Sequence, residues 1–167
     1  TANLSAWTYY LLGDQLDKIS PLVKERIHIK VKRRIIDPLN VRDDYWWLWT
    51  PGKEHTDHHI NNWTPWISSN WLTAVLLLEN DDEKRVDAVY RSMEAIDRFL
   101  NVYHEDGGCD EGPGYFNKAG GASFDCLELL YDASDGTINL YDEPLIYNMA
   151  SYIYKAHIAE KYYTNFA

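Results

Sequence analysis

Two loops rich in amide, acidic and aromatic side chains hold most of the residues whose types could do chemistry. One runs from Asn61 to Trp71 and the other from Asp106 to Phe116. Binding and catalytic groups concentrate in loops that rigid helices hold in place. Indole rings beside amides and carboxylates are typical of a carbohydrate site, since a flat ring covers the C–H face of a sugar. The candidate substrate-binding residues are Trp47, His58, Trp63, Trp66, Asn70 and Glu111.

The candidate catalytic group of the second loop is Tyr115. It follows Gly112-Pro113-Gly114, a run that favours an irregular backbone and leaves the ring uncrowded. A phenol with an ordinary pKa of about 10 can donate or accept a proton when its neighbours lower that pKa. The alternative interpretation is a half-buried tyrosine that only packs.

Two acids beside Tyr115 allow a different chemistry. Asp110 and Glu111 are candidates for the acid and base of a glycosidase. The alternative is that Asp106 and Asp110 support turns of the loop and that Glu111 orients the segment carrying the tyrosine. The residues leave this choice open.

The first loop offers neutral amides among its tryptophans. An amide can bind a carboxylate and lessen its charge, which acidifies the neighbouring C–H bond. Asn61, Asn62 and Asn70 are the candidates. The alternative for Asn62 is helix capping, because it precedes Thr64-Pro65, a typical helix start.

A group of histidines precedes the first loop. His55 and His59 have the i, i+4 spacing of a metal-binding pair, with His58 and Asp57 between them. Such a pair chelates when it is helical. The pattern indicates no helix and no further ligand here. The sequence therefore predicts neither a metal site nor a cofactor.

Composition limits the class of partner. The formal net charge of -10 argues against nucleic acid, which needs a basic face. No window reaches the roughly 18 apolar residues of a membrane span. Two cysteines, Cys109 and Cys126, imply no disulfide framework. The length suggests one domain, residues 1–167.

Helix signals dominate the chain. Val23, Ile27, Val31 and Ile35 repeat every four residues, which marks one face of a helix. Asp37-Pro38 is expected to end that helix. The expected helices cover residues 3–16, 20–37, 64–79, 82–104, 122–132 and 142–156. No segment reads as a strand.

Paired helices with alternating short and long links predict an all-α fold. The long loops, residues 38–63 and 106–121, each follow a pair of expected helices, so they gather at one end of the array. Helical hairpins of this kind form part of an (α/α) toroid. Six helices are about half of a closed toroid, so we expect an incomplete barrel.

The quoted residues also carry a family resemblance. Asn61-Asn62-Trp63, Asn70-Trp71 and the run from Asp106-Gly107-Gly108 to Glu111-Gly112-Pro113-Gly114-Tyr115 resemble the heparinase II/III-like polysaccharide lyases. These enzymes have an N-terminal (α/α) toroid followed by β-sandwich domains. They cleave uronic-acid-containing polysaccharides, such as glycosaminoglycans, by β-elimination.

The resemblance implies roles for single residues. Asn61 or Asn62 would neutralise the uronate carboxylate, and Tyr115 would serve as general base, general acid or both. In the family a further catalytic histidine follows the toroid. We therefore expect this chain to be the helical portion of a periplasmic or secreted lyase that lacks its C-terminal β-sandwich domain. Its expected partner is an acidic polysaccharide.

Two other function classes remain open from the sequence. One is a glycoside hydrolase on a similar toroid that uses Asp110 or Glu111. The other is a helical domain that binds carbohydrate without catalysis. A lyase product carries a new C4–C5 double bond, whereas a hydrolase product carries none.

Overall fold

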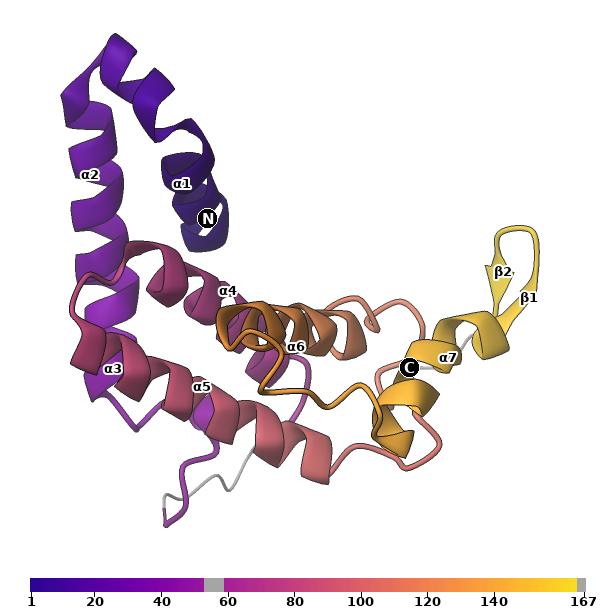
Figure 1. Ribbon diagram of the computed structural model, residues 1–167. Coiled ribbons are helices and arrows are strands. Elements are labelled where there is room, and N and C mark those ends of the chain that lie inside the picture. Colours follow the sequence, from indigo (N-terminus) through magenta and orange to yellow (C-terminus); the bar gives the residue numbers. More distant parts are fainter. Residues whose placement is uncertain (53–58, 165–167) are drawn as a thin grey trace. The chain divides into compact units, whose positions relative to one another are not determined.

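The computed structural model describes residues 1–52 and 59–164 (Figure 1). Helices make up most of it, so the predicted all-α class is confirmed. The chain divides into two compact units. The first unit comprises Thr1–Tyr45 and Asn70–Glu94, and the second comprises Trp46–Ser69 and Ala95–Ala167. The arrangement of the helices as an arc of a toroid stays a prediction.

The first unit begins with a helical hairpin of α1 (Ala2–Ile19) and α2 (Pro21–Val31), drawn in indigo and purple in Figure 1. Ser20 joins them in an extended conformation. Its side chain accepts a hydrogen bond from the N–H of Leu22 at 3.3 Å, and Pro21 takes the first helical position. Ser20 and Pro21 thus form a typical helix start, at the expected beginning of the helix predicted over residues 20–37.

The predicted end of this helix at Asp37-Pro38 is wrong. The helix widens into a π turn, η1 (Lys32–Ile36), and continues as α3 (Asp37–Val41). In the π turn the N–H of Asp37 bonds to the carbonyl of Lys32, five residues back. Pro38 falls in the first turn of α3, where a missing N–H costs little. The helical conformation therefore continues past Pro38 to Val41.

Polar contacts fix these helices on the part of α4 (Trp63–Leu78) that belongs to the first unit, residues 70–78. The indole N–H of Trp71 donates to Asn40 at 3.3 Å. Lys32 forms an ion pair with Glu79, whose side chain is almost fully buried. The buried apolar side chains around them are those of Val31, Ile36, Leu39, Trp71, Leu72, Val75 and Leu78.

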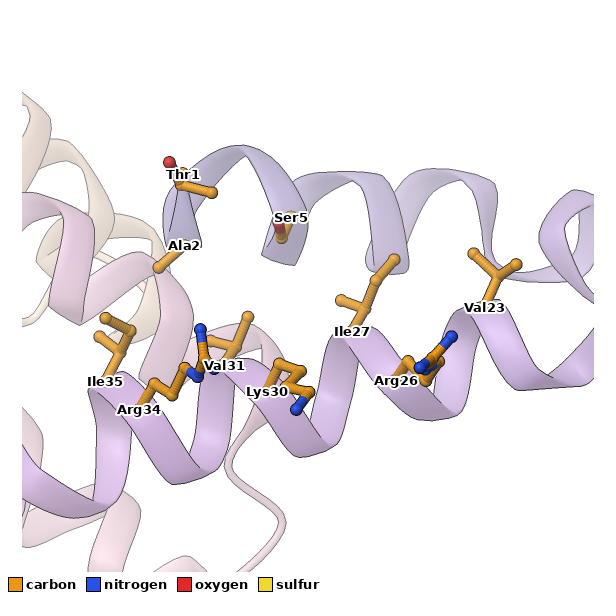
Figure 2. Close-up of a pocket in the computed structure, with 10 residues that line it drawn as sticks. All are labelled: Thr1, Ala2, Ser5, Val23, Arg26, Ile27, Lys30, Val31, Arg34 and Ile35. Atoms are coloured by element: carbon orange, nitrogen blue, oxygen red, sulfur yellow. The ribbon is translucent and has the colours of Figure 1, made fainter.

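A groove of about 560 Å³ runs between α1 and α2 (Figure 2). The predicted four-residue repeat of Val23, Ile27, Val31 and Ile35 lines it, and in Figure 2 Val23 and Ile27 point toward α1. Three cations one helical turn apart line the same groove: Arg26, Lys30 and Arg34. This groove belongs wholly to the first unit.

The second unit contains the helices that frame the two loops. Its parts are η2 (Trp46–Leu48), residues 63–69 of α4, residues 95–101 of α5 (Asp82–Asn101), α6 (Gly120–Ala133) and α7 (Pro144–Ala156). A short hairpin follows α7, formed by antiparallel strands β1 (His157–Ala159) and β2 (Tyr162–Tyr163). The sequence did not predict these strands, because both are short and exposed and show no alternation of buried side chains.

Two apolar clusters hold the second unit together. One joins Phe99 of α5, Cys109 and Ala119 of the loop, and Tyr152 and Ala156 of α7. The other joins Leu127 of α6 with Ile146 and Met149 of α7. The loop between α5 and α6 therefore contributes its own side chains to the core, which ties it to the helices on either side.

Candidate functional site

A pair of hydrogen bonds joins the two loops that the sequence singled out. The backbone N–H of Asn62 donates to Oε2 of Glu111 at 2.9 Å, and the side-chain amide of Asn62 donates to Oε1. The two residues are 49 apart in sequence. Asn62 is only 4% exposed, and Glu111 is half-buried. The structure thus brings the loops together, and the sequence suggested this only through the hairpin of helices between them.

Asn61 and the backbone of η2 fix the first loop against the start of α4. Oδ1 of Asn61 accepts the N–H of Trp63, the first helical residue, at 3.0 Å. The hydroxyl of Thr64 donates to the carbonyl of Trp47 at 2.8 Å. The expectation that Thr64-Pro65 starts the helix is therefore off by one residue, because Asn61 supplies the capping oxygen and the Thr64 hydroxyl is used elsewhere.

Successive turns shape the second loop. Backbone N–H groups donate three residues back, from Gly112 to Cys109, from Tyr115 to Gly112 and from Lys118 to Tyr115, at 2.9, 3.2 and 2.9 Å. Gly112 has a φ of 78°, a conformation that costs little only for glycine. Residues three apart in such turns lie one above the other. The turns thus place the Tyr115 and Lys118 side chains on one side of the loop.

Aromatic rings are exposed at the start of α4, where the expected loop from Asn61 to Trp71 is helical from Trp63 on, and in the second loop. Trp63, Trp66 and Tyr115 are 46%, 41% and 51% exposed. Trp63 and Trp66 are three residues apart on α4, which places them on one helix face. The ring of Trp46 lies 5.3 Å from that of Trp63, centroid to centroid. Trp47, by contrast, is buried, so its ring offers no exposed face on which a sugar could stack.

Lys118 links the two sets of exposed rings. Its Nζ atom lies 4.9 Å from the ring centroid of Trp66 and 5.4 Å from that of Tyr115. The side chain is half-buried. Sequence reasoning missed this residue. Lys118 follows Tyr115 by three residues, and this spacing is the one sequence feature that could have identified it. The spacing places the two side chains together only because the loop forms consecutive turns.

The structure distinguishes the roles of Asn61 and Asn62, which the sequence alone could not. The amide of Asn62 is buried and donates to Glu111. Asn61 uses its oxygen to cap α4, and its NH2 group donates to no group among the described residues. Of the two amides, that of Asn61 is therefore the one with donors available for a ligand.

The acids of the second loop differ in their surroundings. Both oxygens of Glu111 accept hydrogen bonds from Asn62. Asp106 accepts the N–H of Gly108 at 2.8 Å, so it supports a turn. Asp110 is exposed and lines a pocket of about 650 Å³ within the second unit. The other residues that line this pocket are Trp49, His59, Ile60, Arg98, Asn101 and Val102.

The pKa values of Tyr103 and of Cys109 in the second loop are both raised. Burial raises the pKa of the Cys109 thiol. Burial, together with the neighbouring Cys109, raises the pKa of the Tyr103 hydroxyl well above its usual range. Cys109 and Cys126 are both buried and unpaired with each other. These groups serve packing, which distinguishes Tyr103 from the exposed Tyr115.

Two candidate residues are not assigned to this site. Asn70 belongs to the first unit. His58 lies outside the described residues, as do His55 and Asp57 of the metal alternative. Within residues 1–52 and 59–164, no group of three or more His, Cys, Asp or Glu side chains could hold a metal ion. In the same residues, no helix combines the length and the apolar character needed to cross a membrane.

Neither the models of known protein families nor the curated protein sequences match this chain.

Proposed function

We propose that the second unit carries the site of a polysaccharide lyase that cleaves uronate-containing chains by β-elimination. The observation that supports it most is the contact between Asn62 and Glu111, because it joins the amide loop to the loop of Tyr115. The exposed rings of Trp63, Trp66 and Tyr115 supply stacking surface for sugars in the same unit.

The proposed reaction needs one proton removed and one delivered. A base takes the proton from C5 of the uronate, next to the carboxylate. The C–H electron pair forms the C4–C5 double bond, and the bond from C4 to the glycosidic oxygen breaks. Tyr115, exposed at the loop surface, takes the C5 proton as general base and returns a proton to the leaving oxygen.

Neutralising the carboxylate lowers the barrier to this proton removal, and we assign that role to Asn61. Within the part of the chain that the structure describes, the NH2 group of Asn61 donates no hydrogen bond, whereas the amide of Asn62 donates to Glu111. Asn62 then acts by positioning, since it holds the tyrosine loop through Glu111.

The hydrolase alternative would use Glu111 or Asp110 as general acid. Glu111 accepts two hydrogen bonds, which favours a bracing carboxylate over a proton donor. Asp110 is exposed and open to solvent at its pocket. It is the stronger candidate if the reaction proves to be hydrolysis.

The test is a product assay on uronate polymers with the full-length protein. We expect ultraviolet absorbance from the C4–C5 double bond, and we expect Tyr115→Phe to abolish it. Tyr147→Phe is the matched control, because Tyr147 is an exposed tyrosine of α7 in the same unit. If the products carry new reducing ends but no double-bond absorbance, the enzyme is a hydrolase and not a lyase. Saturable sugar binding without either product would indicate a binding domain.

A further inference from the structure

We propose that Lys118 binds, together with Asn61, the carboxylate of the sugar held at Trp66 and so selects acidic over neutral sugars. The inference deepens the proposed function, because it takes from that function the position of the sugar. The evidence for Lys118 itself is separate: its contacts with two rings, the turn that holds it and the absence of an acidic partner among residues 1–52 and 59–164.

The ammonium group of Lys118 lies close to two aromatic rings. It lies 4.9 Å from the Trp66 ring centroid and 5.4 Å from that of Tyr115. Each ring face attracts the cation. The backbone N–H of Lys118 also donates to the carbonyl of Tyr115 at 2.9 Å. A cation fixed in this way loses little conformational freedom when it binds an anion.

No carboxylate among the described residues pairs with Lys118, although the chain has 26 acidic residues. Lys24, Lys32 and Lys84 each pair with an aspartate. Lys118 is half-buried, so part of its hydration is lost without an ion pair in return. An anionic ligand would supply the missing partner.

The position of Lys118 suits the carboxylate of a uronate better than a distant substituent. That carboxylate is bonded to C5, the carbon whose proton Tyr115 is proposed to remove. A group that binds it must therefore lie next to the tyrosine, and Lys118 contacts the Tyr115 ring. Trp66 offers the flat face on which the same sugar ring can stack.

The experiment measures binding and turnover of hexasaccharides from hyaluronan, heparosan and alginate, each as the free acid and as the methyl ester. Ionic strength is varied. The variants are Lys118→Met, Lys118→Arg and the control Lys161→Met. Lys161 is the matched control because its ammonium lies over one ring, that of Tyr162, at 5.9 Å. Both methionine variants remove one positive charge. Circular dichroism checks that each variant is folded.

We expect wild type to bind at least one acid form more tightly than its ester, by roughly 10- to 100-fold, as for a charge-assisted hydrogen bond. Lys118→Met should lose that preference, and Lys118→Arg should restore most of it. Lys161→Met should keep it. Added salt should weaken acid binding in wild type more than in Lys118→Met.

The outcomes separate this inference from the proposed function. If Lys118→Met keeps the preference for the acid form, the inference is overturned, and double-bond formation would still support the lyase. A preference that depends on Lys118, without double-bond formation, supports the inference and overturns the lyase. If wild type binds none of the six ligands, the inference is overturned.

Discussion

The groove of the first unit and the candidate site of the second unit are both surface features, but they are built in different ways. The groove lies along one helical hairpin and repeats with the helix, with aliphatic and cationic side chains one turn apart. The site draws on two loops whose contact joins residues 49 apart, and it combines amide, phenol, carboxylate, ammonium and indole groups. Helical periodicity repeats the same aliphatic and cationic side chains along one helical hairpin, whereas joined loops bring together unlike groups from distant parts of the sequence.

The largest expected effect tests whether the chemistry belongs to the second unit alone. Tyr115→Phe keeps the ring and its contact with Lys118 but removes the hydroxyl that accepts and returns the proton. We expect kcat to fall roughly 10³- to 10⁴-fold with little change in KM. Arg34→Gln in the groove should leave both constants unchanged. Steady-state assays of the full-length protein, which follow formation of the C4–C5 double bond, measure both constants. A reduced kcat in Arg34→Gln would show that the chemistry does not belong to the second unit alone.

A second prediction concerns stability in the first unit. Burial alone would raise the pKa of Glu79, but hydrogen bonds from Lys32 and from the N–H of Asp81 outweigh it and hold that pKa below its ordinary value. Lys32→Met leaves the Glu79 carboxylate buried without its cation. We expect a loss of about 3 kcal/mol in the free energy of unfolding at neutral pH. Denaturant unfolding followed by circular dichroism measures it.

The same pair predicts a pH dependence with a definite sign. A carboxyl group with a lowered folded-state pKa adds stability above its unfolded pKa of about 4.3, and that stability is lost as pH falls through the folded value. The hydrogen-exchange protection factors of residues in α2 and in 70–78 should therefore fall on acidification more in wild type than in Glu79→Gln. Equal acid sensitivity in the two proteins would contradict this role of Glu79.

A third prediction tests the contact between the loops. Glu111→Gln keeps one acceptor oxygen but sets an NH2 group against the N–H donors of Asn62. We expect a stability loss of about 1–2 kcal/mol and a fall in kcat of roughly 10-fold, because the Tyr115 loop is less well held. The hydrolase alternative predicts the reverse ranking, with Asp110→Asn or Glu111→Gln the more damaging change and Tyr115→Phe mild. Comparing kcat for the three variants decides between the lyase and the hydrolase.

Local patterns predicted the helices because capping residues and apolar spacing act within a few residues. Ser20-Pro21 and the repeat from Val23 to Ile35 show this directly. The continuation through the π turn could not be predicted, because it depends on how Lys32 and Asp37 are bonded once the helix has formed. A proline signal alone does not reveal a widened turn.

Residue types identified both loops but not the contacts within them. Nothing local distinguishes Asn61 from Asn62; the distinction arises from Glu111, far along the chain. Lys118 was missed for a related reason. Its placement beside Tyr115 depends on consecutive turns, and its contact with Trp66 depends on tertiary structure. Tertiary contacts of this kind leave little trace in the spacing of a single sequence.

The smallest expected effect asks whether the backbone of the second loop matters apart from its side chains. Gly112 and Gly52 have φ values of 78° and 80°, and both belong to the second unit. Replacing either with Ala should cost about 1 kcal/mol in unfolding free energy, since an L side chain is disfavoured there. The two variants should differ in activity, because Gly112 belongs to the turns that hold Tyr115, whereas a Cβ at Gly52 meets no neighbour. We expect Gly112→Ala to lower kcat several-fold and Gly52→Ala to leave it unchanged. Equal kcat in the two variants would mean that Tyr115 tolerates a shifted loop. The contact of Asn62 with Glu111 would then be sufficient to position it.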